Sequence, residues 1–455
     1  MSTRLPAPPA PGPLEAFAAE FDSLFATLAQ RRSFREYLQG LLLPRDRNKT
    51  LTALAGAEPI TQAQEAPVQR LQFFLSEATW DPEPVIECRL ALLFAHPEAA
   101  PHEGGILVID ETGDRKNGSK TDHVARQYLG SGGKVDNGIV SVTSLWADER
   151  VYYPLHVEPY TPAERLPKGK QDPAFRTKPQ LGMELVDRTL SMGVSFRAVV
   201  GDCLYGESAH FEGALWAAGI PYVLGLRPSR GSWAPAEAAH TPQEAAQELR
   251  WNGSDEPQDW TKVGRRFRDG HTEVWWAAEL TLGGYGPENP TRLVVATTDP
   301  ATLPSERTWY LATNLPAPGS PQAEKWPLPP ADLAEVLRLY GLRNWVEQSY
   351  KQAKGQLGWA DFQVRKDRAI RRHWELVCCA FCFCWWGRFR PREMAEPVGE
   401  KRSSQSVRDR PASPRKQLAH CLAPSARVAS PVEHALALLA GVERIAPTTG
   451  APGTA

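Results

Sequence analysis

Between residues 104 and 228, short apolar runs alternate with amphipathic segments, and this alternation limits the fold more than any other feature. The runs are short and rich in Val, Ile and Leu, which is typical of buried strands. The expected strands are 104–112, two within 134–160, 196–202 and 220–228, and the expected helices are 177–194 and 208–219. The order of three strands, a helix, a strand, a helix and a strand predicts a mixed α/β sheet with flanking helices.

The N-terminal region before this alternation has a different pattern. Residues 14–100 are predicted to be helical, because apolar residues such as Phe17 and Phe21 recur at steps of three and four. The short helices expected at 48–58 and 66–78 resemble a helix-turn-helix, and an ordinary helical bundle is an equally good interpretation. Because this region is separate from the segments described below, we expect the rest of the chain to fold without it.

The C-terminal half contains three further kinds of segment. Residues 229–330 are rich in Pro, Gly and Trp, and they are predicted to form a separate β-rich insertion. Its expected strands are 272–282, 291–298 and 308–315. A basic helical stretch follows at 331–390. Residues 1–13 and the Ser-, Pro- and Arg-rich tail 391–455 are expected to be mostly disordered, apart from a short helix at 432–445.

The composition excludes several classes of protein. The formal net charge of −1 is not that of a basic nucleic-acid coat, so any nucleic-acid binding needs local positive patches. No apolar run reaches about eighteen residues, so no transmembrane helix is expected. The N-terminus lacks the apolar core of a secretory signal. Four of the 7 cysteines crowd into 378–384, which is poor spacing for disulfides and favours buried thiols in a cytoplasmic protein.

Two aspartates follow predicted strands at equivalent positions. Asp110 ends the first strand and Asp202 ends the fourth. Carboxylates at the ends of adjacent strands converge at one edge of an open α/β sheet. With a third carboxylate they can hold two Mg²⁺ ions, which prefer oxygen ligands and assist phosphodiester displacement. Either aspartate considered alone is more often a loop cap.

The third carboxylate candidate lies on a predicted helix in the basic stretch. On one continuous helix, Tyr340, Arg343, Glu347 and Lys354 fall within an arc of about 60°. A neighbouring arc is apolar and can be buried. Its members are Leu339, Leu342, Val346, Tyr350 and Ala353. The helix therefore can direct these four polar side chains at one site, whereas the alternative is a solvated salt-bridge pattern on an exposed face.

The spacing Tyr-x2-Arg-x3-Glu-x6-Lys resembles the Y-R-E-K signature of transposases related to the insertion sequence 4 superfamily. The segments 108–118, 124–138, 175–190, 199–208 and 362–374 resemble, in order, the motifs of the insertion sequence 701 branch, the DDE superfamily endonuclease family. The sequence departs from the commoner pattern at Cys203, where an acid often follows the second aspartate.

The resemblance implies a ribonuclease-H-like mixed sheet in which Asp110, Asp202 and Glu347 form the catalytic, metal-binding triad. Its cofactor would be two Mg²⁺ ions, with Mn²⁺ able to substitute. Its partners would be terminal inverted repeats and target DNA, bound by a homodimer in the cytoplasm at the nucleoid. The implied layout is a helical DNA-binding domain at 14–100, a catalytic domain at 101–228 and 331–390, and the insertion at 229–330.

The resemblance also implies that Tyr340, Arg343 and Lys354 contact DNA phosphates, with Lys354 exposed on its helix. Further DNA-binding candidates are basic residues elsewhere. They are Arg126, Lys134, Arg365, Lys366 and Arg371. The glycine-rich segment 130–134 lacks the Walker pattern, so no nucleotide cofactor is expected. Trp275, Trp276 and Trp309 are interpreted as core or sheet-face residues, any one of which might alternatively stack on a base.

The favoured function is therefore that of a transposase, which cleaves DNA ends and transfers strands. Two alternatives remain. A domesticated, transposase-derived DNA-binding protein would be favoured by a lost triad residue, and none is lost. A ribonuclease-H-like nuclease without strand transfer would leave the Y-R-E-K pattern and the β-rich insertion unexplained.

Overall fold

The computed structural model describes residues 6–232, 237–267, 270–282 and 291–389. The expected disordered tail at 391–455, with its short helix, lies outside the described residues, as does the start of the expected N-terminal disorder.

Five strands form the centre of the molecule, and they match the predicted alternation. They are β1 (Ile106–Arg115), β3 (Lys134–Ala147), β4 (Tyr152–Tyr160), β5 (Ala198–Gly201) and β6 (Tyr222–Leu226). Their order in the sheet is β4, β3, β1, β5, β6. The first three strands pair antiparallel, whereas β5 and β6 run parallel to β1. The predicted mixed α/β class is confirmed.

Apolar side chains explain why β1 lies at the centre of this sheet. Ile106 to Ile109 are completely buried, because helices cover both faces of the strand. Asp110 follows at the point where the sequence stops being purely apolar. Its register partner on β3 is Thr143, and its predecessor Ile109 pairs with Gly201 on β5. The polar end of β1 therefore lies beside the end of β5.

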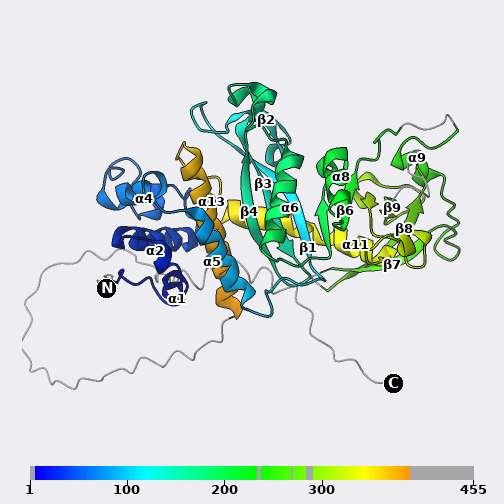
Figure 1. Cartoon of the computed structure of the whole chain (residues 1–455), viewed down its shortest axis with the longest axis horizontal. Coiled ribbons are helices and arrows are strands. Elements are labelled where there is room, and N and C mark those ends of the chain that lie inside the picture. The colour runs from blue at the N-terminus through cyan, green and yellow to red at the C-terminus, as the bar shows by residue number, and fades with distance from the viewer. Residues whose placement is uncertain (1–5, 233–236, 268–269, 283–290, 390–455) are drawn as a thin grey trace, which may run out of the picture.

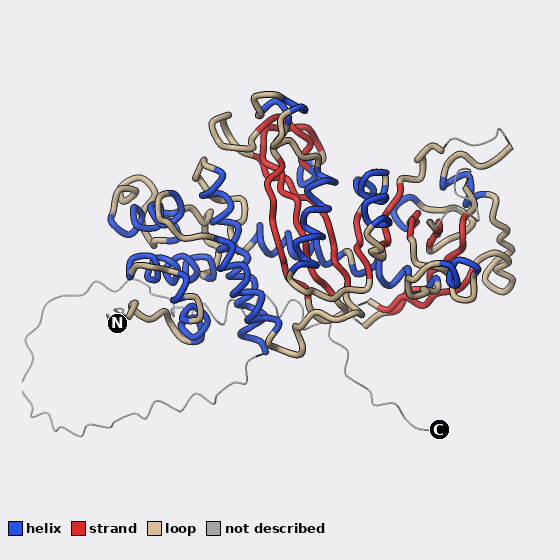
Figure 2. Tube along the Cα trace, in the orientation of Figure 1, coloured by secondary structure: helices blue, strands red, loops and turns tan. Residues whose placement is uncertain are grey.

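Four strands extend the same sheet beyond β6, and this corrects the expectation of a separate β-rich insertion. They are β7 (Thr261–Arg266), β8 (Thr272–Leu280), β9 (Arg292–Thr297) and β10 (Thr308–Thr313). The strand β10 pairs antiparallel with β6, and the order continues through β9 and β8 to β7. An otherwise open edge of β6 supplies the hydrogen-bonding groups that β10 needs. Figure 2 shows these strands curving away from the central ones.

The helices divide between the two faces of the sheet and an N-terminal group. The N-terminal helices are α1 (Pro13–Ala19), α2 (Leu28–Leu42), α3 (Leu51–Leu54), α4 (Ala66–Ser76) and α5 (Pro82–Phe94). The later ones are α6 (Lys178–Ser191), α7 (Cys203–Gly206), α8 (Ala209–Ala217), α9 (Pro242–Gln247), α10 (Pro321–Lys325), α11 (Leu333–Leu342), α12 (Asn344–Gly355) and α13 (Asp367–Phe389). The long helix α13 lies between the N-terminal helices and β4 (Figure 1).

The N-terminal helices share one hydrophobic core with α13 and the sheet, which argues against the expectation that the rest of the chain folds without them. Phe17 packs on two aromatic rings of α13. The hydroxyl of Tyr37 lies 2.7 Å from Nδ1 of the buried His373. Arg89 is completely buried and forms an ion pair with Glu375 at 2.5 Å. Without residues 14–100, α13 would expose this core and leave Glu375 without its counter-ion.

The sequence of α13 contains the crowded cysteines. Cys378, Cys379, Cys382 and Cys384 are all buried and free, as predicted. Within the described part of the chain, no helix combines the length and apolar character needed to cross a membrane.

Candidate active site

The carboxylate of Asp110 lies in the middle of β1, directly after its apolar run. One oxygen, Oδ1, accepts the backbone N–H of Glu111 at 2.8 Å. The other, Oδ2, accepts a hydrogen bond from Nη2 of Arg343 at 3.1 Å. The side chain is only 10% exposed, so its charge depends on that arginine.

Asp202 directly follows β5 and is the N-cap of the short helix α7. Its Oδ1 accepts the backbone N–H of Leu204 at 2.9 Å, which fixes the side chain. Its Oδ2 lies 4.0 Å from Nη2 of Arg343. Because β5 is the parallel neighbour of β1, the strand ends bring Asp202 to the same side of the sheet as Asp110.

Glu347 reaches the same arginine from α12. Its Oε1 lies 3.8 Å from Nη1 of Arg343, and its side chain is 67% exposed. The structure therefore gathers all three predicted carboxylates around a single guanidinium. Arg343 itself is 16% exposed.

The charges at this site oppose one another. The pKa of Asp110 is raised to about 7, chiefly by burial, with Arg343 opposing the rise and the charges of Asp202 and Glu111 adding to it. Burial alone would lower the pKa of Arg343, but Asp110, Tyr340 and Asp202 hold it above its ordinary value. The arginine is thus a permanent cation, while Asp110 is a carboxylate that gains from any additional positive charge nearby.

The helix carrying the four polar residues is interrupted at Arg343, so the single continuous helix expected for them is wrong. Helix α11 ends at Leu342 and α12 begins at Asn344. Around the break, the N–H of Arg343 bonds to the carbonyl of Tyr340, three residues back, rather than four. Tyr340 therefore belongs to the preceding helix.

Tyr340 is largely buried against β6 and β10, two neighbouring strands of the sheet. Its ring packs edge-on against Trp309, with centroids 5.1 Å apart. Its hydroxyl lies so close to Gly225 that a Cβ there would be 2.6 Å from it, which explains the glycine. Burial raises the pKa of Tyr340 to about 12. The charges of Arg343 and Asp202 also act on this pKa, so Tyr340 lies close to the carboxylate site.

Lys354 does not lie beside Glu347 as an exposed residue, which is a second correction. Its Nζ lies 2.7 Å from Oδ1 of Asp114 and donates to the carbonyl of Gly113 at 3.0 Å. Asp114 is buried, and it lies four residues beyond Asp110, about 13 Å along the strand. Lys354 therefore ties the C-terminal turn of α12 to β1.

Comparison with known proteins bears on this arrangement. Residues 20–280 match the family model described as DDE superfamily endonuclease. The chain is 34% identical over 362 residues to the probable transposase for insertion sequence element IS701 of Microchaete diplosiphon. That alignment covers 79% of this chain and 83% of the relative. The chain belongs to the DDE superfamily endonuclease family. The predicted membership, the ribonuclease-H-like fold class and the status of an enzyme are confirmed.

Enzymes of the DDE superfamily generally use divalent metal ions, so we asked whether these residues suit one. No three His, Cys, Asp or Glu side chains within the described ranges already form a metal-binding cluster. The donors are nonetheless hard carboxylate oxygens, which suit a divalent cation. Asp110 also has a raised pKa, and Asp202 and Glu111 contribute to it. The residues fit a divalent metal chemically, with Arg343 among them as the resident cation.

Glu111 is a further acid at this site that the sequence reasoning did not single out. Its Oε1 lies 3.1 Å from Nζ of Lys178 on α6, and burial raises its pKa against the effect of that lysine. The signal was present in the sequence, because Glu111 directly follows Asp110. Side chains alternate along a strand, so Glu111 points towards α6 while Asp110 points towards α12.

The remaining basic candidates fall into two groups. Arg126 and Lys134 are exposed on the hairpin formed by β3 and β2 (Ala125–Leu129), and Arg365 and Lys366 are exposed just before α13. The strand β2 was not predicted. Arg371 is less exposed and pairs closely with Glu158 at 2.5 Å and Asp367 at 2.8 Å, whereas Lys134 has only a 4.0 Å contact with Asp136. The charge of Arg371 is already neutralised within the protein.

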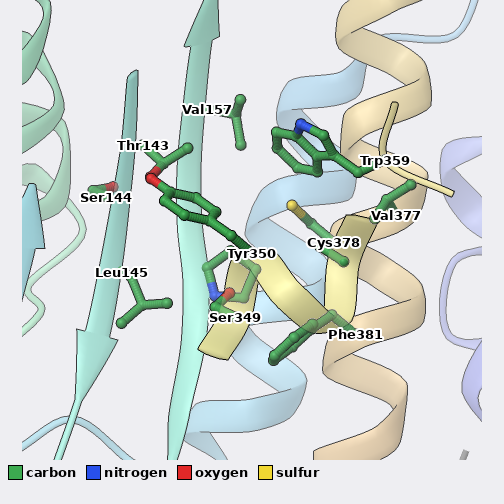
Figure 3. A pocket seen from close by; sticks show the side chains of 12 residues that line it. Thr143, Ser144, Leu145, Val157, Ser349, Tyr350, Trp359, Val377, Cys378 and Phe381 are labelled. Carbon is green, nitrogen blue, oxygen red and sulfur yellow. The ribbon is translucent and has the colours of Figure 1, made fainter. Parts of the chain in front are cut away.

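A small cavity lies behind the carboxylates, between the sheet and helices α12 and α13 (Figure 3). It measures about 20 Å³, which is room for one water molecule and no substrate. Tyr350 borders it and lies 2.5 Å from the hydroxyl of Thr143, the register partner of Asp110. This contact packs α12 against the sheet next to the carboxylates.

Proposed function

We propose that this DDE superfamily member is the transposase of an insertion sequence. It would cleave DNA at terminal inverted repeats and join the freed ends to target DNA. The observation that carries the proposal is the meeting of Asp110, Asp202 and Glu347 around Arg343, from two strands and a helix. The relative named as a probable transposase supports the choice of reaction.

Asp110, Asp202 and Glu347 would hold the metal, which we take to be two Mg²⁺ ions that Mn²⁺ can replace. When bound, the ions would supply Lewis-acid activation for successive in-line displacements at phosphorus. The protein's own part is to orient the acids. The helix cap of Asp202 and the backbone hydrogen bond of Asp110 fix two of them. Glu347 is the most exposed of the three acids, so its side chain can change conformation.

Arg343 would have two successive roles. Before metal binds, it balances the carboxylates. When DNA arrives, its permanent charge would contact a phosphate near the cleaved bond, as the resemblance implies. Lys354 and Tyr340 would act on DNA indirectly, since both are engaged within the protein.

DNA outside the catalytic centre would contact exposed cations. Arg126 and Lys134 on the β2–β3 hairpin and Arg365 and Lys366 before α13 suit the sequence-independent binding of phosphates. We further propose that helices within 14–100 help to recognise the terminal repeat. We also propose that a homodimer forms on DNA, and that the enzyme works in the cytoplasm at the nucleoid.

The decisive experiment is a cleavage and strand-transfer assay. Purified protein would be incubated with a duplex ending in the inverted repeat that flanks its gene, with Mg²⁺ and a plasmid target. Cleavage followed by joined products supports a transposase. Cleavage without joining would favour a ribonuclease-H-like nuclease, and binding without either reaction would favour a domesticated DNA-binding protein.

A further inference from the structure

Arg265 on β7 lies among three aromatic rings. Its guanidinium carbon is 4.4 Å from the ring centre of Phe267, 5.1 Å from that of Trp275 and 4.5 Å from that of Trp309. Cation–π contacts of this kind hold the flat guanidinium by its faces. We call this arrangement the aromatic cage.

The N–H groups of Arg265 have no acceptor among the residues that the structure describes. No hydrogen bond from its side chain is found there, and no ion pair within 4.0 Å. The nearest acid, Glu273, lies close to His271 at 3.8 Å and Arg307 at 3.5 Å. Burial lowers the pKa of Arg265 to about 10, with only Glu273 opposing this, so the side chain still carries its charge at neutral pH.

Arg372 shows what a purely structural stacked arginine does in this protein. It too lies over a tryptophan, Trp80, with its guanidinium carbon 4.6 Å from the ring centre. Its N–H groups, however, donate to the backbone carbonyls of Leu75 and Trp80. Arg265 has the same stacking without the acceptors. Its donors are therefore held in position and open to an acceptor from outside the protein.

The aromatic cage lies next to the segment that brings Arg343 to the carboxylates. Trp309, one wall of the cage, packs against Tyr340. The guanidinium of Arg265 lies beside Gly341, where a Cβ would be 3.0 Å from its Nη2. Gly341 is two residues before Arg343. Arg265 and Arg343 therefore both lie at the C-terminal end of α11, so one DNA strand passing this end could contact both side chains.

We propose that Arg265 is a phosphate-binding residue that holds the backbone of the DNA strand entering the carboxylate site. This inference rests on the proposed function, because it assumes that DNA is the substrate. A guanidinium fixed by stacking loses little freedom when it binds, and its planar fork matches a phosphate.

The test is the salt dependence of DNA binding by the full chain. The probe is a fluorescent duplex ending in the inverted repeat that flanks the gene, without divalent metal. Arg265→Met keeps a long side chain in the cage and removes the charge. It should bind the probe about tenfold more weakly, as expected for one charge-assisted hydrogen bond. The slope of log affinity against log salt should fall by about one.

Arg266→Met is the matched control, because Arg266 is exposed on the opposite face of the same strand. It should leave affinity and slope close to those of the wild type. Arg265→Lys keeps the charge and should retain the slope, which provides a second variant if Arg265→Met unfolds.

Three outcomes would overturn the inference. If Arg265→Met lowers only the thermal midpoint and leaves the affinity and the salt slope unchanged, the aromatic cage serves only the stability of the fold. If affinity falls while the slope stays, Arg265 contacts a base and not a phosphate. If the wild-type chain itself does not bind the probe, the proposed function fails, and that result is distinct from the first two.

Discussion

Nη2 of Arg343 lies 3.1 Å from Oδ2 of Asp110, so a permanent cation stands against the most buried acid of the site. The same guanidinium reaches Asp202 at 4.0 Å and Glu347 at 3.8 Å. A divalent ion entering among these acids meets the positive charge of Arg343. In the proposed metal site, the arginine and the metal would therefore compete for the same carboxylates until the arginine binds another anion.

Replacing Arg343 tests this competition directly. Arg343→Gln should tighten Mn²⁺ binding to the DNA-free protein by about tenfold or more, since a like charge a few ångströms away is removed. Isothermal titration calorimetry measures the affinity. The control is Arg338→Gln, because Arg338 pairs with Glu149 on the surface away from the carboxylates. Weaker Mn²⁺ binding by Arg343→Gln would mean that the arginine orients the acids.

Asp110→Asn should abolish DNA cleavage while leaving DNA binding nearly intact. Losing a ligand of the proposed metal would remove several kcal/mol of transition-state stabilisation, so the rate should fall at least about a thousandfold. Cleavage of terminal-repeat DNA in Mg²⁺ and a gel-shift assay measure the two properties. Asp136→Asn, on the neighbouring strand β3, should cut normally. If Asp110→Asn cleaves at the wild-type rate, Asp110 has no role in catalysis.

Lys354→Ala should destabilise the fold. Asp114 is buried and would lose its partner, at a cost of about 1–3 kcal/mol in the free energy of unfolding. Urea denaturation measures the change. Lys351→Ala, at an exposed position on the same helix, should be within about 0.5 kcal/mol of the wild type. If the two variants are equally stable, the contact with Asp114 contributes little, and Lys354 is available to bind DNA.

Arg89→Met should be among the most damaging single changes in the N-terminal helices. It leaves the buried Glu375 uncompensated, which costs about 3–5 kcal/mol. The double variant Arg89→Met with Glu375→Leu should recover much of that loss. Arg32→Gln, which breaks an exposed pair with Glu36, should cost less than about 0.5 kcal/mol. If chemical denaturation gives Arg89→Met and Arg32→Gln the same free energy of unfolding, the N-terminal helices are only loosely attached to the rest of the fold.

Acid should weaken the protein through buried histidines. Burial lowers the pKa of His373 to about 3 and that of His156 to about 2, whereas both have the ordinary value near 6.5 when unfolded. Their stabilising neutral forms are fully present above that value. As the pH falls below about 6.5, these histidines become protonated in the unfolded chain but stay neutral in the folded protein.

Each histidine should then remove about 1.4 kcal/mol per pH unit from the free energy of unfolding, down to its folded pKa. His156→Leu should make the loss between about pH 6 and about pH 4 shallower by that amount, as measured by urea denaturation at several pH values. It should not destabilise the protein at neutral pH, because both ring nitrogens of His156 are buried without hydrogen-bond partners in the described structure. An unchanged pH slope would show that His156 is protonated in the fold.

The central sheet could be predicted because its signal is local. Apolar runs such as 106–109 are buried on both faces, and their composition shows this without knowledge of their neighbours. The candidate acids could be predicted for the same reason, since Asp110 and Asp202 come where such runs end. The strand β2 carries only five residues, two of them exposed and basic or aromatic, so no such signal exists there.

Other features depend on contacts between distant segments, and pattern alone could not supply them. The pairing of β10 with β6 joins residues far apart in the chain, which made the insertion look separate. The break at Arg343 comes between α11 and α12, whereas helical arithmetic assumes one regular helix through the whole segment. Helix periodicity predicts an exposed Lys354 and cannot reveal its ion pair, because the partner, Asp114, lies on strand β1.

The position of α13 has a consequence for the order in which the protein matures during synthesis. The ribosome makes the N-terminal helices and β4 long before residues 367–389, the helix that joins them in one core. Until that helix emerges, the apolar faces of both groups are without their shared partner. A chain that stops short of residue 367 would therefore carry every acid of the candidate site and still lack the element that completes its core, so incomplete products of translation should be inert and readily degraded.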